Sequence, residues 1–492
     1  MLSSRRRILV ALLSWTLLAA GCPGGEDPDP GNTTPANNTT SHDMTKTADM
    51  GGGDMPAEDM ADTAKDMRDA IEDMEQVPDM TAPPVDMADA APRLSEASCE
   101  IGNPPARSVK PGTDLLRVTL EAPLAVCNDG SPGVFYIKPG SGSGADKWLI
   151  WLEGGGGCTS GESCARRWCG RNIPSTAAKM SSKWAPDGIE GAGVFDSPAG
   201  ATNDFANWNH VVAYYCSSDS WAGRIEHPRL SDPTGTVEDF SLVLHGKHIL
   251  TAMLDVLDEG ARSDSGAMQM PPLTEASMVL FSGTSAGGGG ARLNADDVRE
   301  RLLSNNPNVD FRLVVDAGVW TKEPSEDFSE EASQAFFDNS YAISSNFRNL
   351  FTDASCLAYH TRDPEKCSEP THILLEHTET PFFIKMDYSD RVDSPGVYAD
   401  NETFTRSTYA LLQSIAAGDF SPEEAGARQA GGVFAPNCGH HVALESGEFY
   451  NIKISDGAAS ASFHDVLSNW ARGAEPTFVL DDREDVFSSV CR

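Results

Sequence analysis

Short apolar runs alternate with longer amphipathic stretches over most of the chain beyond residue 140. The runs are about five residues long and end in polar or glycine-rich sequence, as buried strands do. The longer stretches, 242–257, 291–303 and 407–417, carry apolar residues at helical intervals. This alternation predicts an α/β fold with a mostly parallel sheet and helices on both faces. The predicted strands are Trp148–Leu152, His210–Tyr215, Met278–Phe281, Arg312–Val315 and Phe382–Met386.

The N-terminus has a different pattern. Three arginines, 5–7, precede the apolar stretch 8–20, which is too short for a typical membrane span and predicts a secretory signal over residues 1–21. The run Leu18-Ala-Ala-Gly-Cys22 is similar to the lipobox of bacterial lipoproteins. That resemblance implies a lipid anchor on Cys22, and Pro23 in the next position favours delivery to the outer membrane. The alternative is an ordinary cleaved signal with an incidental cysteine.

Residues 22–97 predict a disordered acidic tether. Asp-Met occurs eight times in this segment, and 18 acidic against 4 basic side chains lie between Glu26 and Glu96. Aliphatic side chains are scarce, so the segment cannot bury enough apolar surface to offset the loss of chain entropy. Copper binding by the methionines is disfavoured, because the spacing is irregular and each methionine follows an aspartate. We therefore expect a folded domain over residues 98–492.

The net charge of −36 constrains the partners. The predicted domain stays strongly negative without the tether, which opposes nucleic acid binding and repels polyanionic substrates. A neutral or heavily acetylated glycan, or a small acyl ester, fits better unless the cleft is locally basic through Arg166, Arg167 and Arg224.

The apolar run at 278–281 leads into Gly283-Thr-Ser-Ala-Gly287, the G-x-S-x-G pattern of a nucleophile elbow. A serine on a sharp strand-to-helix turn leaves no room for side chains at the flanking positions, and glycine meets that requirement. Ser285 is therefore the candidate nucleophile, and the fold is expected to be α/β-hydrolase-like with insertions. The alternative is an ordinary Gly/Ser loop.

A second glycine-rich segment, 154–157, follows the apolar run that ends at Leu152. Acyl transfer develops negative charge on the carbonyl oxygen, and each fixed N–H donor contributes about 3–4 kcal/mol. We place the oxyanion hole at the N–H groups of Gly155 or Gly156 together with that of Ala286. Four consecutive glycines are also compatible with a flexible surface loop.

The base and the acid should follow the serine in the order acid, then histidine. Of the later histidines, the pair His440-His441 lies in a loop marked by Pro436, Asn437 and Gly439, as catalytic histidines often do. The acid should follow the late strand at 382–386, where three aspartates qualify. These are Asp387, Asp390 and Asp393, and physical reasoning does not choose among them.

Six ordered blocks resemble the pectin acetylesterase and Notum family of carboxylesterases over residues 99–492. They are Leu152–Cys158, Trp208–Cys216, Gly283–Gly288, Val315–Gly318, Pro381–Asp390 and Cys438–His441. In that family the acid lies nine residues after the proline of the late strand and the base three residues after the cysteine.

The resemblance therefore implies Asp390 as the acid and His441 as the base, with Asp387, Asp393 and His440 as alternatives. It implies that His441 takes the proton of Ser285 while Asp390 orients the imidazole. Family members usually carry an aromatic residue in or just after the oxyanion glycines. This chain has Gly156 and Gly157 there and lacks that ring.

Other polar residues beside these blocks favour structural roles. Asp316 is expected to shape a turn after a strand, and Glu153 to make a supporting hydrogen bond rather than to act as an acid. Trp221, Arg224 and His227 are expected either to line the cleft or to belong to a packed surface loop.

No C-x-x-C pair and no H-E-x-x-H motif occurs, so we expect no catalytic metal and no cofactor. Ten of the eleven cysteines remain besides Cys22, which permits up to five disulfides in an exported chain. Cys356 and Cys367 are expected to close a local loop, and Cys158, Cys164 and Cys169 to brace the segment beside the oxyanion glycines. A disulfide, rather than nucleophilic chemistry, is expected at Cys438.

These patterns together predict a monomeric serine carboxylesterase, tethered to the membrane through Cys22, that removes acyl groups, above all acetyl, from a carbohydrate. One alternative is a deacylase of longer chains, as in the Notum branch. The other is a non-catalytic surface-binding lipoprotein, against which the intact set of Ser285, Asp390 and His441 argues.

Overall fold

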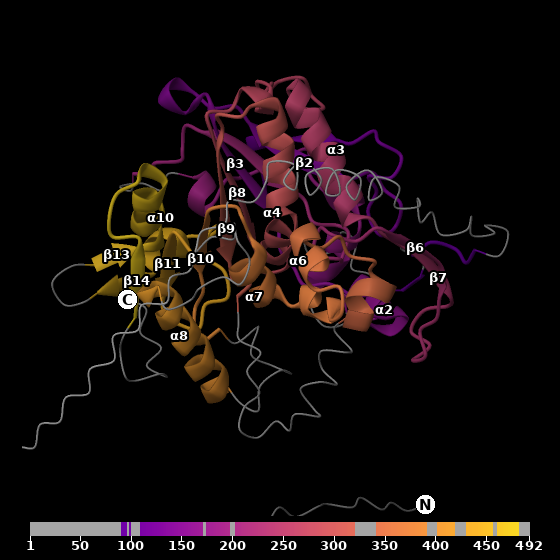
Figure 1. Cartoon of the computed structure of the whole chain (residues 1–492). Helices are drawn as coiled ribbons and strands as arrows, with labels where there is room; N and C mark the ends of the chain where they lie inside the picture. The colour runs from indigo at the N-terminus through magenta and orange to yellow at the C-terminus, as the bar shows by residue number, and fades with distance from the viewer. Residues whose placement is uncertain are drawn as a thin grey trace, which may run out of the picture. The chain divides into compact units, whose positions relative to one another are not determined.

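The computed structural model describes residues 90–95, 98–99, 109–170, 174–196, 202–319, 341–390, 401–418, 430–455 and 460–481. Ten strands of the described residues form one sheet, in the order β14-β11-β10-β9-β8-β3-β5-β2-β1-β4 (Figure 1). In sequence order these strands are β1 (Pro111–Thr119), β2 (Val134–Lys138), β3 (Lys147–Leu152), β4 (Gly188–Ile189), β5 (Asn209–Ala213), β8 (Met278–Thr284), β9 (Asp310–Asp316), β10 (Phe382–Lys385), β11 (Gly432–Ala435) and β14 (Phe478–Leu480).

The seven strands from β14 to β5 run parallel to one another. Strands β2, β1 and β4 continue the sheet in antiparallel fashion beyond β5. The central strands β3, β5 and β8 are buried almost throughout, as strands covered on both faces must be. Two small antiparallel pairs lie outside the main sheet, β6 (Ile225–Leu230) with β7 (Phe240–Leu244) and β12 (Lys453–Ser455) with β13 (Ser460–Ser462).

Helix α4 follows β8 directly and packs against β8, β9 and β3, while α8 and α10 pack on either side of β11 (Figure 1). The α-helices are α2 (Gly161–Trp168), α3 (Gly246–Glu259), α4 (Ala286–Asn305), α6 (Ala354–Tyr359), α7 (Pro370–His372), α8 (Asn401–Ala417), α9 (Glu448–Asn451) and α10 (Phe463–Arg472). Short 3-10 helices are η3 (Gly142–Gly144), η4 (Pro174–Met180), η5 (Ser182–Trp184), η6 (Gly193–Phe195), η7 (Leu273–Glu275) and η9 (Pro364–Ser368), and π-helical turns are η8 (Ile343–Phe347) and η10 (Ile373–His377). The predicted α/β-hydrolase-like architecture is confirmed.

One predicted element begins in the wrong place. The helix expected over 242–257 contains the end of β7, and the helix itself, α3, begins at Gly246. The apolar run Phe240–Leu244 is buried at every position and pairs with β6. A short run of this kind fits a strand as well as a helix, and here long-range pairing decides the outcome.

The carboxyl ends of β3, β8, β9, β10 and β11 all open on the same edge of the sheet because these strands are parallel. Ligand sites of open α/β sheets lie at this edge. The loops after these strands carry the glycine-rich segment, Ser285, Asp316, Asp390 and His441 in turn.

The predicted signal peptide, Cys22 and most of the predicted tether lie outside the described residues. Residues 90–95, the last described part of that tether, lie against the β6–β7 pair. The N–H of Ala91 donates to the carbonyl of Pro228 (2.9 Å), and Arg93 forms an ion pair with Glu226 (2.6 Å). Contact with the folded domain thus begins before the expected boundary at residue 98. Within the described ranges, no helix has the length and apolarity needed to cross a bilayer.

Candidate active site

Ser285 lies on the turn between β8 and α4 with φ 54° and ψ −123°. Positive φ is unfavourable for a residue with a side chain, and here two backbone hydrogen bonds hold it, from Ser285 N–H to Asp316 O (2.9 Å) and from Gly289 N–H to Ser285 O (2.9 Å). A Cβ at Gly283 would lie 2.1 Å from the carbonyl oxygen of Gly287, and one at Gly287 would lie 2.0 Å from that of Leu152. Both flanking positions therefore require glycine, which gives a physical basis for the sequence pattern.

The glycine-rich segment follows β3 and lies beside the same turn. A Cβ at Gly154 would come within 3.0 Å of the Cβ of Ser285. Gly155 and Gly156 have φ of 140° and 65°, a region that favours glycine. Ala286 is the first residue of α4, so its N–H has no acceptor within the helix and is free to bind a developing anion.

Three side chains hold this segment by its carbonyl groups. Lys179 Nζ donates to Gly154 O (2.6 Å), Arg167 Nη1 to Gly155 O (2.7 Å), and Tyr215 Oη to Gly156 O (2.8 Å). Burial raises the pKa of Tyr215 to about 12, with the negative charge of Asp219 adding to it, so the phenol stays protonated and able to donate. The segment is a braced turn rather than a flexible loop.

Glu153 supports this bracing, as the sequence indicated. Its carboxylate accepts hydrogen bonds from Lys179 Nζ (2.7 Å) and from the N–H of Tyr215 (2.9 Å). Its carbonyl accepts from Trp221 Nε1 (3.0 Å), and Trp221 is fully buried. Trp221 therefore packs against the start of the glycine-rich segment. His227 stacks on Phe347. Among the residues that the structure describes, neither His227 nor Arg224 lines the cavity at Ser285.

His441 and Asp390 form a close pair at the ends of neighbouring strands. Asp390 follows β10, His441 follows β11, and His441 Nδ1 lies 2.6 Å from Asp390 Oδ2. The Asp390 side chain is fully buried, whereas that of His441 retains 17% exposure. A buried carboxylate on Nδ1 fixes the tautomer that leaves Nε2 as the basic atom.

The alternative acids and base occupy different environments. Asp387 accepts hydrogen bonds from the N–H groups of Ser389 (3.0 Å), Cys438 (3.0 Å) and His440 (2.9 Å). Burial raises the pKa of Asp387, although Lys385 and these donors oppose the shift. Asp387 thus shapes the loop that carries the histidines, and His440 takes part through its backbone. Asp393 lies outside the described residues.

A buried ion pair between Asp316 and Lys385 holds the histidine loop against the sheet. The two charged groups lie 3.0 Å apart with no exposed side-chain surface. Lys385 Nζ donates to the carbonyl of His441 (3.0 Å), and Asp316 Oδ2 accepts from the N–H groups of Ala443 (2.7 Å) and Leu444 (2.8 Å). Burial lowers the pKa of Lys385, but the carboxylates of Asp316 and Asp387 outweigh it and the net shift is upward.

Asp316 also reaches the other side of the site, because its carbonyl accepts the N–H of Ser285 (2.9 Å). The sequence indicated only a turn-forming role for Asp316 and did not single out Lys385. Lys385 is the last residue of an otherwise apolar strand, β10. A single lysine at such a position is the sequence signal that could have indicated a buried ion pair. A lysine inside such a run is rarely buried without a partner.

A cavity of 560 Å³ opens at Ser285 and His441. Part of its wall is apolar, and Trp151 and Phe195 meet there edge to face with their ring centres 5.7 Å apart. The glycine segment of this chain has no aromatic residue, and Trp151 and Phe195 supply the aromatic rings of the cavity wall instead. The apolar lining residues are Val109, Leu115, Trp151, Ile189, Ala192, Phe195, Val212 and Val442, and the charged ones are Lys110, Glu153, Lys179, Glu190 and Glu445.

Glu445 is a cavity residue that the sequence reasoning missed. It accepts a hydrogen bond from Thr284 Oγ1 (3.2 Å), next to the candidate nucleophile. Burial raises the pKa of Glu445 to about 7, and the negative charge of Asp316 adds to the shift. No spacing rule marks this residue, since it is placed by the fold of the histidine loop.

The disulfides agree with the cysteine pattern. Cys356 pairs with Cys367, and Cys158 with Cys164, immediately after the glycine segment. Two longer bridges are Cys99–Cys169 and Cys127–Cys216. Cys438 is also disulfide-bonded, so it is no thiol nucleophile. Disulfides are typical of proteins exported to an oxidising compartment.

The chain was compared with known proteins. A family model described as Pectinacetylesterase matches residues 113–486. Pectin acetylesterase 5 of Arabidopsis thaliana is 28% identical over 276 residues, 55% of this chain and 57% of that protein. The palmitoleoyl-protein carboxylesterase NOTUM of Drosophila melanogaster is 28% identical over 350 residues, 70% of this chain and 46% of that protein.

The chain thus spans about half the length of these curated relatives. A crystal structure of the Wnt deacylase Notum from Drosophila superposes with a TM-score of 0.57 at 24% identity, covering 75% of this chain and 97% of that one. At this identity the superposition speaks for the fold alone. The family expected from the six sequence blocks is confirmed by the match over residues 113–486.

Proposed function

The chain belongs to the pectinacetylesterase family, and from that premise we propose that it is a serine carboxylic ester hydrolase. Ser285 is the proposed nucleophile, His441 the general base, and Asp390 the residue that orients and stabilises the imidazole. One observation carries this proposal. A serine in an enforced elbow conformation and a histidine held 2.6 Å from a buried carboxylate line the same cavity.

In the proposed mechanism, His441 Nε2 accepts the proton of Ser285 Oγ as that oxygen attacks the ester carbonyl. Asp390 stabilises the imidazolium through Nδ1–H. The N–H of Ala286, with that of Gly155 or Gly156, binds the negative oxygen of the tetrahedral intermediate. His441 then protonates the leaving alcohol. In the second half His441 takes a proton from water, whose oxygen attacks the acyl carbonyl, and the proton returns to Ser285 Oγ as the carboxylic acid leaves.

The proposed substrate is an acylated carbohydrate, with acetyl as the acyl group. Lys110 and Glu190 form an ion pair at the cavity, and Lys179 pairs with Glu153. With Glu445, the lining carries three carboxyl groups and two ammonium groups, so it offers no net positive field for a polyanion. Paired charges and carbonyl groups suit the hydroxyl groups of a neutral sugar.

A second candidate is a deacylase of longer chains. The apolar wall formed by Leu115, Trp151, Ile189 and Phe195 is larger than an acetyl group needs. Such a wall favours the burial of methylene groups, each of which contributes about 0.8 kcal/mol. Relatives named as palmitoleoyl-protein carboxylesterases support this second candidate, since palmitoleoyl is a long acyl chain.

The place of action belongs to the same proposal. The four disulfides of the described residues support an exported protein. We propose that Cys22 carries a lipid anchor and that the acidic segment after it spaces the domain from the outer membrane. Mass measurement of the mature N-terminal peptide would detect the diacylglyceryl group on Cys22.

The acyl preference is tested with p-nitrophenyl esters from acetate to palmitate, with the disulfides kept oxidised. Turnover that peaks at acetate supports the carbohydrate deacetylase, and a peak at long chains supports the second candidate. Ser285→Ala should abolish turnover of every ester while the protein remains folded by circular dichroism. A folded wild-type protein that hydrolyses no ester would instead favour a glycan-binding scaffold.

A further inference from the structure

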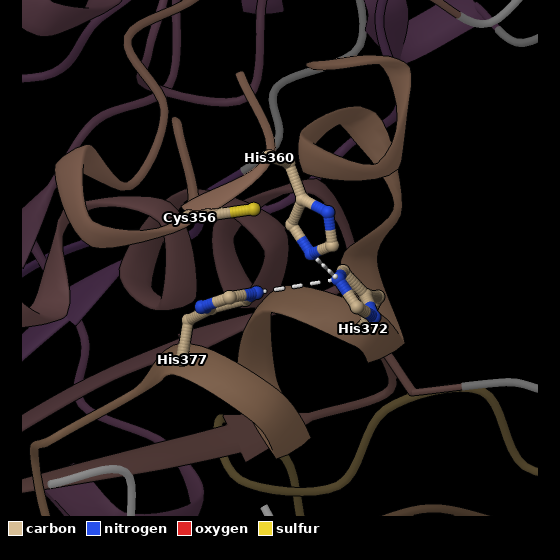
Figure 2. Close-up of side chains that lie close together, drawn as sticks. All are labelled: Cys356, His360, His372 and His377. Carbon is tan, nitrogen blue, oxygen red and sulfur yellow. Dashed lines mark hydrogen bonds between the residues drawn. The ribbon is translucent and has the colours of Figure 1, made fainter. Parts of the chain in front are cut away.

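Three histidines converge on one point in the segment between η8 and β10. His360 follows α6, His372 ends α7, and His377 ends η10 (Figure 2). His372 Nε2 lies 2.9 Å from His360 Nε2 and 3.2 Å from His377 Nε2. Figure 2 shows the three rings pointing toward one another, and one ligand atom from each, with the Cys356 sulfur, falls within 4.8 Å of the others.

This cluster is mostly buried, with His372 partly exposed, and it is not part of the ester site. His360 and His377 have 3% and 0% exposure. None of the three is among the described residues that line the cavity at Ser285. Ile373, Cys356 and Cys367 beside them pack against Leu293 of α4, the helix that begins after Ser285.

Three neutral imidazoles cannot form both of these Nε2–Nε2 contacts as hydrogen bonds. Asp363 Oδ1 lies 3.2 Å from His360 Nδ1, which places the proton of His360 on Nδ1 and a lone pair on Nε2. His372 Nε2–H can then donate to His360 Nε2. The same proton on His372 Nε2 cannot also be donated to His377 Nε2. Nor can His377 donate to His372, because a protonated His372 Nε2 has no lone pair with which to accept.

A cation at the centre resolves the conflict, because each Nε2 then contributes a lone pair. We propose that His360, His372 and His377 bind one Zn²⁺ ion through their Nε2 atoms. Zn–N bonds of about 2.0–2.1 Å in tetrahedral geometry separate two ligand nitrogens by about 3.3 Å. The observed separations of 2.9 and 3.2 Å are within a few tenths of an ångström of that value.

The residues around the three histidines are of the types found around zinc-binding histidines. A ligating histidine commonly donates its other ring N–H to a carboxylate, which is the role of Asp363 toward His360. A set of imidazoles without carboxylate or carbonyl oxygens suits Zn²⁺ and disfavours Mg²⁺ and Ca²⁺. Cys356 is in a disulfide with Cys367, so it is no thiolate ligand, and the proposed site has three protein ligands among the described residues.

The ion would cross-link the end of α6, α7 and η10 within the segment 341–378, since all three ligands belong to that segment. That segment reaches the ester site, because Arg348 Nε donates to the carbonyl of Cys158 (3.1 Å), next to the glycine segment. Zinc bound here is therefore expected to stabilise the fold, with no step of ester hydrolysis passing through it.

The test is zinc content by mass spectrometry after the disulfide-intact protein is equilibrated with Zn²⁺ and dialysed. We expect one zinc per wild-type chain and the same for His248→Ala, which removes an imidazole elsewhere. We expect His372→Ala to lose more than nine tenths of the zinc. Equal zinc in His372→Ala and wild type, or no zinc in folded wild type, would overturn the proposal.

Two further readouts separate loss of the site from loss of the fold. Co²⁺ bound by wild type should give the intense visible absorption of a tetrahedral complex, and His377→Gln, which can still fold around a polar side chain, should lack it. A chelator should lower the melting temperature of wild type but not of His377→Gln. An imidazolium paired with Asp363 is the competing account, and it predicts no chelator effect in either protein.

Discussion

Ser285 shows how a single residue can be determined by its neighbours. Around its positive φ the backbone packs so closely that a Cβ at Gly283 or Gly287 would clash with a carbonyl oxygen. The sequence pattern therefore encodes a steric requirement, and this is why a five-residue motif identified the candidate nucleophile. The acid was harder to find from residues alone. Asp387 and Asp390 lie on one turn, and only their partners separate them.

Replacing Asp390 and Asp387 separately by asparagine should give opposite outcomes. Asp390→Asn should lower kcat by about 10⁴-fold with little change in the melting temperature, because the imidazole loses its correct tautomer. Asp387→Asn should mainly lower the melting temperature, because an amide has one acceptor oxygen and cannot accept both from Ser389 on one side and from Cys438 and His440 on the other. Ester kinetics and thermal melting of both variants test this. A larger kcat loss in Asp387→Asn would reassign the acid.

Glu445 should make stability depend on pH. Its folded pKa of about 7 lies above its ordinary 4.5, so the neutral form is favoured in the folded state. The contribution to stability is full below pH 4.5 and is lost as the pH rises to about 7. Glu445→Gln should therefore gain stability relative to wild type over that window, as melting temperatures at successive pH values would show. Glu448→Gln on α9 is the matched control, and identical curves for Glu445→Gln and wild type would contradict the account.

At the scale of elements, the strands that sequence patterns predicted are those buried on both faces. Trp148–Leu152 and Met278–Phe281 are continuous apolar runs, and the strands that contain them extend to Lys147 and to Thr284. The edge strands β4 and β14 were not foreseen, since two or three residues carry no periodicity. Phe240–Leu244 was assigned to a helix because its pairing with β6 is a tertiary effect.

The loops at the sheet edge depend on a contact that no local pattern reveals. Asp316 and Lys385 come from β9 and β10 and join the serine turn to the histidine loop. The sequence separation of 69 residues hides the pair, and only the parallel register brings the two together. The convergence of His360, His372 and His377 escaped the sequence search for the same reason, because their spacing fits no helical motif.

Lys385→Met should destabilise the domain by about 3–5 kcal/mol, because it leaves Asp316 buried without its cation. It should also lower kcat, since the carbonyl of His441 loses its donor. Lys183→Met is the control, because Lys183 pairs with Asp129 while half exposed and such a pair contributes less than about 1 kcal/mol. Chemical denaturation and ester kinetics measure both effects, and equal destabilisation by the two substitutions would contradict the account.

At the scale of the whole molecule, the net charge bears on which substrates can approach the cavity. The net charge is −36, and the segment before the domain carries 14 of those charges. Arg166, Arg167 and Arg224 were the candidates for a basic cleft, and none of them is among the described residues that line the cavity. The cavity lining carries three carboxyl groups against two ammonium groups, so it does not reverse the negative charge of the molecule.

Salt should accordingly separate two classes of substrate. Raising the ionic strength from about 0.01 M to 0.15 M shortens the Debye length from about 30 Å to 8 Å and screens the repulsion of polyanions. Acetate release from an acetylated polygalacturonate should become several-fold faster, whereas release from a neutral acetylated glycan should change little. A polyanionic substrate that is hydrolysed more slowly in salt would reveal a basic binding surface.

The central claim is that Ser285 is the nucleophile and His441 its base. The most direct measurement is covalent labelling with a fluorophosphonate, followed by intact mass and peptide mapping. We predict one phosphonyl adduct per chain on Ser285, no adduct in Ser285→Ala, and labelling slowed by several orders of magnitude in His441→Ala. An adduct on another residue, or labelling that persists unchanged in Ser285→Ala, would contradict the account.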